Sequence, residues 1–186
     1  MKFLYWYALF FMICFSANVF AQGFKSPQKF KSFGKIQVNY GLGLNEVLLE
    51  QKANPFQIKL TIGKQNEHFG AGLGLATANF RNRGDNGGLN INTISFTLNT
   101  HYVFKEFSGV GSKPFVRLGG GYAPKIFREY SKGFLYDGSI GYVITNKKGA
   151  KYFVEAQYQV QNFDDFLYRT HQVKAESVGL GIGIWF

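Results

Sequence analysis

The sequence predicts an all-β protein: an eight-stranded antiparallel transmembrane β-barrel of the up-and-down type, preceded by an N-terminal signal peptide. Three observations predict this fold. The first residues have the features of a secretory signal. Eight later segments alternate large apolar residues with small or polar ones. The alternation continues to the last residue, Phe186, without a polar tail.

The signal peptide is expected over residues 1–21. One lysine precedes an apolar run over residues 3–15, and Val19 and Ala21 occupy the −3 and −1 positions of a cleavage site before Gln22. The run is short for a membrane-anchoring helix, which is the alternative interpretation. The single cysteine of the chain lies in this stretch. A mature protein without it forms no disulfide.

Eight amphipathic segments follow with regular spacing. Each carries apolar side chains at every second position, as a β-strand with two different faces does. In order they are KIQVNYGLGL (35–44), PFQIKLTIG (55–63), FGAGLGLA (69–76), TISFTLNTHYVF (93–104), FVRLGGGY (115–122), YDGSIGYVI (136–144), YFVEAQYQV (152–160) and SVGLGIGIWF (177–186). Turn-forming sequences such as NRGDNGG and NKKGA separate several of them. This pattern predicts an antiparallel sheet that closes into a barrel.

The apolar face of these strands is expected to point outward, to lipid. An eight-stranded barrel has an interior just wide enough to be filled by side chains, and the many large apolar residues of the segments would not fit there. The other face is dominated by Gly, Ser, Thr, Asn and Gln, which suit a narrow lumen. Closure also pairs the backbone hydrogen-bonding groups, as a hydrocarbon solvent requires. Such alternating segments with interfacial aromatic residues are typical of transmembrane β-barrels.

The last strand resembles the C-terminal insertion signal of bacterial outer-membrane proteins. Its alternating apolar residues are Val178, Leu180, Ile182, Ile184 and Phe186. With the signal peptide and the eight strands, the chain resembles the small outer-membrane β-barrel family that includes outer membrane proteins A and X. The resemblance implies an outer-membrane location in a Gram-negative bacterium, and recognition by the barrel-assembly machinery. Residues 22–32 would then form a short periplasmic N-terminal segment, and residues 33–186 the barrel domain.

The resemblance also implies a topology in which both termini lie in the periplasm, with short turns there and longer loops outside. The outer loops are expected near Asn45–Asn54, Arg81–Asn90, Lys125–Lys132 and Gln161–Gln172. The periplasmic turns are expected near Lys64–His68, Glu106–Lys113 and Asn146–Ala150.

Four charged residues fall on the predicted lumen face: Lys59, Arg117, Asp137 and Glu155. They would serve either an ion pathway or a hydrolytic site, or they would form buried pairs that hold the lumen together. We favour a structural polar network because buried charges must be paired. Their positions along the strands predict that Arg117 pairs with Glu155 in the lower lumen, and Lys59 with Asp137 higher up.

No motif predicts catalysis. His171 lies near Glu176 and Ser177, but these residues lack the spacing expected for the His/Ser/Glu triad of lipid A deacylases. The tripeptide Arg-Gly-Asp at 83–85 matches an adhesion ligand, yet it also suits a flexible turn. The net charge of +10 sits largely in short lysine-rich segments, which indicates solvated turns or contact with anionic lipid rather than nucleic acid.

The sequence therefore predicts a non-enzymatic integral outer-membrane protein with a structural, envelope-integrity or surface-binding role. The expected partners are outer-membrane lipids and lipopolysaccharide, and the expected state is a monomer. No cofactor, metal or nucleic acid is expected. The alternatives are a narrow ion or small-solute channel and a lipid A-modifying hydrolase.

Overall fold

The computed structural model describes the chain from residue 29 to residue 186, except residues 49–50, 82–89, 127–129 and 165–171. The predicted signal peptide and most of the segment 22–32 lie outside the described residues. Within the described part, no helix is long and apolar enough to cross a membrane.

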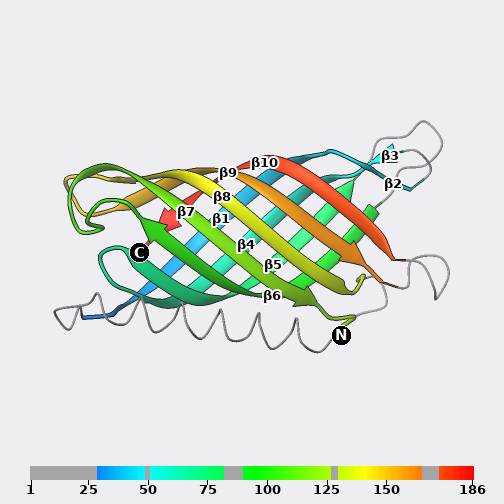
Figure 1. Ribbon diagram of the computed structural model, residues 1–186, viewed down its shortest axis with the longest axis horizontal. Helices are drawn as coiled ribbons and strands as arrows, with labels where there is room; N and C mark the ends of the chain where they lie inside the picture. Colours follow the sequence, from blue (N-terminus) through cyan, green and yellow to red (C-terminus); the bar gives the residue numbers. More distant parts are fainter. Residues whose placement is uncertain (1–28, 49–50, 82–89, 127–129, 165–171) are drawn as a thin grey trace, which may run out of the picture.

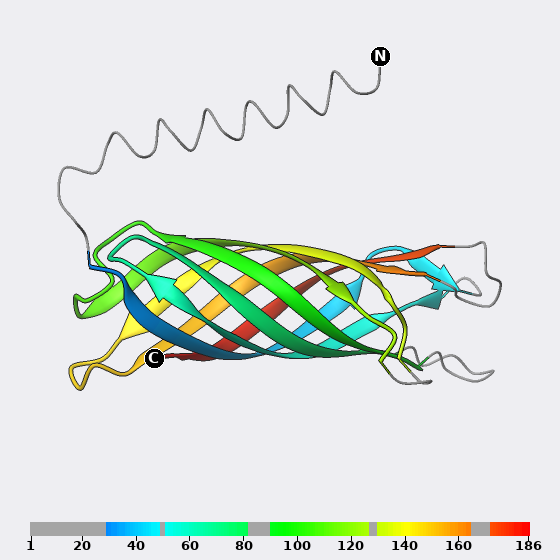
Figure 2. The ribbon, with the colours of Figure 1, turned by 90° about the horizontal axis from the view of Figure 1, so that it is seen from below.

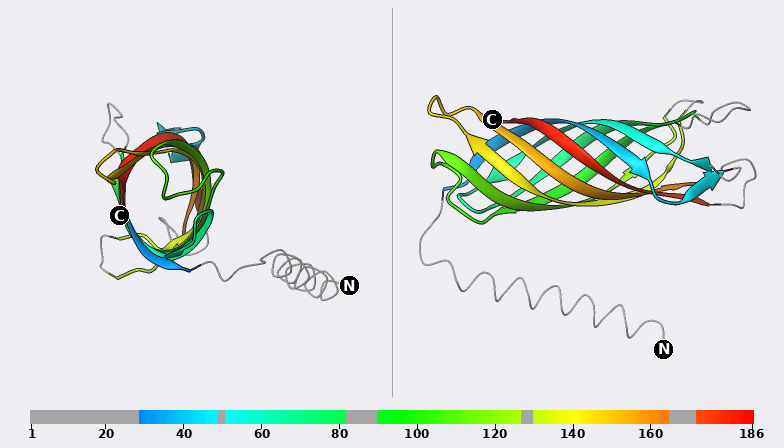
Figure 3. Two further views of the ribbon diagram at one scale, coloured as in Figure 1. Left: turned by 90° about the vertical axis from the view of Figure 1, so that its left-hand side faces the viewer. Right: turned by 90° about the horizontal axis from the view of Figure 1, so that it is seen from above.

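Eight strands close into an antiparallel barrel, as the view along its axis shows (Figures 1 and 3). They are β1 (Lys31–Gly43), β4 (Asn54–Gln65), β5 (Phe69–Arg81), β6 (Asn90–Val103), β7 (Gly111–Ala123), β8 (Gly133–Thr145), β9 (Lys151–Phe163) and β10 (Val173–Trp185). Each strand pairs with its neighbours in the sequence, and β10 pairs with β1 to close the ring. The predicted eight-stranded up-and-down barrel is confirmed.

Two further strands correct the prediction of an outer loop over Asn45–Asn54. β2 (Glu46–Leu48) and β3 (Gln51–Lys52) form a separate two-stranded sheet there. The amide group of Asn45 anchors this sheet to β10, because it donates to the Lys174 carbonyl and accepts from the Glu176 N–H, both at 2.7 Å. Strands of two and three residues are too short to show an alternating pattern.

The barrel strands are longer than the periodic segments that predict them. β1 begins at Lys31, two residues before the expected boundary at Phe33, and its first residue pairs with Gln65 of β4. Backbone pairing between β1 and β4 continues beyond the residues whose side chains alternate between apolar and polar. The strand is therefore longer than the alternating segment that predicts it. The start of β1 and the C-terminus lie at the same end of the barrel, which we call the terminal end (Figure 2).

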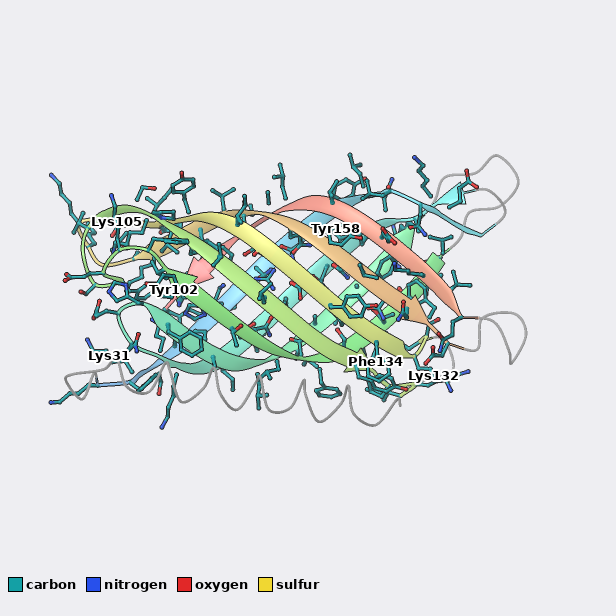
Figure 4. The ribbon with its side chains drawn as sticks, viewed as in Figure 1. Lys31, Tyr102, Lys105, Lys132, Phe134 and Tyr158 are labelled. Carbon is teal, nitrogen blue, oxygen red and sulfur yellow. The ribbon has the colours of Figure 1, made fainter. Side chains whose placement is uncertain are left out.

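The outward side chains form an apolar belt, and the inward ones are buried. Along β10, for example, Leu180 and Ile182 are exposed, whereas Ser177 and Trp185 are buried. The direction predicted for the two faces is therefore confirmed. Cationic side chains occupy both rims, with Lys31 and Lys105 at the terminal end and Lys132 at the opposite end (Figure 4).

Side chains fill the lumen in three layers. At the terminal end lies an aromatic plug, formed by Phe33, Val103, Phe107, Phe115, Val143, Phe153 and Trp185. At the opposite end of the barrel lies an apolar plug, formed by Val47, Ala53, Ala78, Phe80, Ile91, Phe163 and Ala175. Polar and charged side chains occupy the layer between them.

Candidate functional site in the barrel lumen

Arg117 of β7 is the centre of the charged layer. Its Nη2 donates to Glu155 Oε1 at 2.7 Å and its Nε donates to Glu155 Oε2 at 3.3 Å, a two-point contact with one carboxylate. Its Nη1 donates to Asp137 Oδ2, and Lys59 Nζ donates to the other oxygen of Asp137 at 3.4 Å. All four side chains are buried. The four residues singled out in the sequence therefore form one continuous chain of opposite charges across the lumen.

Both predicted pairs form, Arg117 with Glu155 and Lys59 with Asp137, but the expectation that they are separate is wrong. Arg117 contacts both carboxylates, so Lys59, Asp137, Arg117 and Glu155 form a single cluster. The sequence reasoning counted positions from the strand ends, but strands of a closed barrel are tilted and staggered by shear. Counting positions from a turn is therefore a poor guide to which side chains meet, and the long Arg117 side chain reaches both carboxylates.

Uncharged side chains complete the network around the ion pairs. Glu155 also accepts from Ser139 Oγ at 2.9 Å and from Gln37 Nε2 at 3.2 Å. Asn39 Nδ2 donates to Gln57 Oε1 at 3.0 Å, and Gln37 Nε2 also donates to Asn39 Oδ1 at 3.1 Å. Further contacts from Arg117 reach Asn99 and Gln157. The network thus links six strands: β1, β4, β6, β7, β8 and β9.

Glycines on the lumen face make room for this network. A Cβ atom at Gly181 of β10 would collide with the Asn39 side chain, and one at Gly119 of β7 would collide with Asp137. The glycine-rich face that the sequence displays is therefore matched to the bulk of the polar side chains opposite.

Lys35 is a third lumen cation, which the sequence reasoning did not identify. Only 2% of the residue is exposed, and its Nζ has no hydrogen-bond partner among the described residues. The ammonium lies 4.1 Å from the ring centroid of Trp185, 4.6 Å from that of Phe153 and 5.2 Å from that of Phe115. Cation–π attraction to these rings stabilises the ammonium, which forms no direct ion pair with a carboxylate of the described residues. The sequence does contain a sign that Lys35 faces the lumen, because it lies two residues before Gln37 and four before Asn39, on the same face of the strand.

His101 packs against the aromatic plug. It is buried on the lumen face, with Nε2 3.1 Å from Gln65 Oε1. Its ring packs edge-on against Trp185 and Phe33, at centroid distances of 4.6 and 5.0 Å. The Trp185 indole N–H donates to the same Gln65 oxygen at 3.2 Å. The contacts of this histidine are therefore those of a packed side chain.

The structure separates the residues that were weighed as a catalytic triad. Ser177 is buried in the lumen, whereas Glu176 faces outward and accepts from the Tyr158 hydroxyl at 2.8 Å. His171 and the Arg-Gly-Asp tripeptide at 83–85 lie outside the described residues. Within the described residues, no group of three or more His, Cys, Asp or Glu side chains is placed to hold a metal ion.

The residues of the expected insertion signal lie on the lipid-facing side of the last strand. Val178, Leu180, Ile182, Ile184 and Phe186 are all exposed there. The backbone of Phe186 exchanges two hydrogen bonds with Gly34 of β1, at 2.7 and 2.8 Å. The end of the chain therefore takes part in barrel closure, and its role in insertion stays a prediction.

Sequence comparison finds no matching family model and no matching characterised protein. Solved structures do resemble the chain. The outer membrane protein OprG from Pseudomonas aeruginosa is 15% identical over 83% of this chain and 95% of its own, with a TM-score of 0.50. Neisserial surface protein A is 13% identical over 85% of this chain and 99% of its own, also with a TM-score of 0.50.

The chain has the fold of the small eight-stranded outer-membrane β-barrels. The outer membrane enzyme PagL has a TM-score of only 0.48, at 15% identity over 79% of this chain and 97% of its own, and supports no argument about activity. A closed barrel with an apolar outer face spans a membrane with its strands. The fold therefore agrees with the outer-membrane location expected from the sequence.

Proposed function

We propose that this protein is a non-enzymatic structural barrel of the outer membrane whose lumen is closed to ions. The observation that carries the proposal is the position of Arg117, which bridges Asp137 and Glu155 in the middle of the lumen. Apolar plugs lie on either side of this charged layer. Rigidity, rather than transport, is the property that such an interior favours.

The energetics of the charged layer support a closed lumen. An ion that crosses the barrel must separate Arg117 from one of its carboxylates. Removing one member of a buried pair typically costs about 3–5 kcal/mol, because the partner stays charged without compensation. The same ion must also enter the aromatic plug, where side chains pack around Trp185 and offer few polar groups.

Conductance in planar bilayers tests the closed lumen. We expect the refolded protein to add no current steps above the leak of the bilayer. Insertion is verified on the same sample by the different gel mobility of folded and boiled protein, which is characteristic of closed barrels. Discrete current steps from the native protein would contradict the proposal and support the narrow channel.

Mass analysis of lipid A tests the absence of enzymatic activity. Support for this part comes from the opposite orientations of Ser177 and Glu176. Cells that overproduce the protein and cells that lack it should contain lipid A of the same acylation. Loss of an acyl chain that depends on the protein would show that it is a lipid A-modifying hydrolase.

A further inference from the structure

A groove of about 830 Å³ interrupts the apolar belt at the terminal end of the barrel. Its floor follows a row of outward residues that are direct partners across neighbouring strands. Gly34 of β1 lies opposite Ile62 of β4, which lies opposite Leu73 of β5, which in turn lies opposite Leu98 of β6. Phe186 borders the row on the other side, because its ring lies against Gly34. We call this depression the terminal groove.

Small side chains produce the terminal groove. In a second row, Ser32 lies opposite Lys64, and Lys64 lies opposite Ala71. Ser32, Gly34 and Ala71 therefore place three small residues near one another at outward positions, where most of the belt carries large apolar residues. The resulting surface is apolar along its floor and has one cation, Lys64, on its rim.

The terminal groove continues into a polar pocket on the rim of the barrel. Ser32 and Phe186 line both, and the rim pocket has a volume of about 140 Å³. Three lysines line the rim pocket: Lys29, Lys31 and Lys151. Glu67, which has the one side-chain carboxylate among the residues that line this pocket, accepts a hydrogen bond from the Ser108 N–H at 2.9 Å. With Lys64 next to it, this end of the groove has a clear excess of positive charge.

We propose that the terminal groove and the rim pocket together bind one anionic glycerophospholipid of the periplasmic leaflet. The apolar groove fits an acyl chain, and the lysines at its end fit the phosphate. Short turns mark the terminal end as periplasmic in barrels of this kind. The inner leaflet is therefore the lipid source, and lipid A of the outer leaflet is not. Lys64 stands at an outward position, and its stem reaches from the apolar surface to the headgroup level, which places its ammonium beside the phosphate.

Native mass spectrometry of the full barrel in detergent tests the lipid preference. The probes are phosphatidylglycerol and phosphatidylethanolamine with identical acyl chains, and purified lipid A. We expect the protein to retain one phosphatidylglycerol in preference to either of the others. Equal retention of the two phospholipids would show only ordinary boundary lipid and would overturn the proposal. Preferential retention of lipid A would overturn it as well.

Charge variants test the rim. Each lysine beside an anionic lipid is worth about fivefold in binding. The double variant Lys31→Gln with Lys64→Gln should therefore lose roughly 25-fold in phosphatidylglycerol retention. Lys147→Gln with Lys148→Gln removes the same charge from a different turn at the terminal end, and it should retain the lipid as the native protein does. Equal loss in both double variants would mean that net charge, rather than this site, attracts the lipid.

Filling the groove tests the acyl-chain half of the site. Ala71→Leu places a larger side chain on the floor and should lower retention of phosphatidylglycerol several-fold. Ala156→Leu makes the same change on the lipid-facing side of β9, outside the groove, and should have no effect. Both side chains point to lipid, so heat-dependent gel mobility should show that both variants fold. Unchanged retention in Ala71→Leu would overturn the proposal.

Discussion

Arg117 and Lys35 are both cations buried in the lumen, and the barrel accommodates them in opposite ways. Arg117 donates to two carboxylates, which in turn bind neighbouring polar side chains. Among the described residues, no carboxylate lies within an ion-pair distance of Lys35, whose ammonium lies over the faces of three aromatic rings. The first cation depends on direct contact with groups of opposite charge, whereas the second depends mainly on attraction to the faces of neutral aromatic rings.

This difference determines which substitutions the surroundings of Arg117 and of Lys35 tolerate. Removing a carboxylate from the Arg117 cluster leaves a buried charge without compensation, because the guanidinium stays protonated. Removing the ammonium of Lys35 leaves only neutral rings. The charged layer should therefore be sensitive to single changes, and the aromatic plug should tolerate loss of its cation. The following predictions test this contrast, from the largest expected effect to the smallest.

Glu155→Ala should destabilise the barrel most, by about 3–5 kcal/mol, because Arg117 loses its two-point partner. Urea unfolding in detergent micelles measures this, with the fluorescence of Trp185 as the probe. Glu155→Gln serves as the control, since it keeps hydrogen-bonding groups in place while it removes the charge. Its loss should be smaller than that of the alanine variant. A loss below about 1 kcal/mol for Glu155→Ala would show that the pair is not a main support of the lumen.

Gly119→Ala should cost about 1–3 kcal/mol, because its Cβ would displace the Asp137 carboxylate from the network. Gly120→Ala is the matched control on the adjacent residue. A Cβ at Gly120 meets nothing closer than the Leu135 carbonyl oxygen at 4.0 Å, so this variant should unfold like the native protein. The same urea titration compares the two. Equal stability of both variants would mean that the lumen at Gly119 is wider than the structure shows.

Lys35→Met should change the free energy of unfolding by less than about 1 kcal/mol, since an apolar side chain replaces a cation–π contact of similar worth. Lys59→Met is the comparison, because it removes a partner of Asp137. We expect the second variant to lose more stability than the first in the same assay. A larger loss of stability for Lys35→Met than for Lys59→Met would contradict the distinction between a cation stabilised by carboxylates and one stabilised by aromatic rings.

Glu67 should give the smallest effect, which depends on pH. The hydrogen bond from the Ser108 N–H holds the pKa of this carboxyl below its ordinary value of 4.5. The ionised form is therefore favoured by folding, and its contribution is present above pH 4.5 and lost as the pH falls through the lowered pKa. Glu67→Gln should lose about half a kcal/mol or less at pH 7. Unfolding curves of the two proteins should approach each other as the pH falls below 4.5, and a constant difference would contradict this.

The period of two in the sequence is sufficient to predict the barrel and the direction of its faces, because the side of the sheet on which a residue lies depends only on parity. That is why Lys59, Arg117, Asp137 and Glu155 were found as lumen residues. Lys35 was missed because its segment was read from its first apolar residue, Ile36. Phe115 and Phe153 share the parity of Arg117 and Glu155, yet large aromatic residues were counted only toward the lipid face.

The height of a residue along the barrel axis could not be predicted in the same way. It depends on strand tilt and shear, which come from pairing between strands and leave no local mark in the sequence. For that reason, the two expected ion pairs merge into one cluster around Arg117. The β2–β3 sheet was missed for a different reason, because it depends on the contact between Asn45 and β10.

A double-mutant cycle on Arg117 and Glu155 tests the central claim that the charged layer joins strands across the lumen. The free energies of unfolding of Arg117→Ala, Glu155→Ala and the double variant are compared with that of the native protein. The double variant should cost at least about 1 kcal/mol less than the sum of the single variants, because no orphan charge remains. Additivity within about 0.5 kcal/mol would show that the two residues do not interact, and would contradict the network.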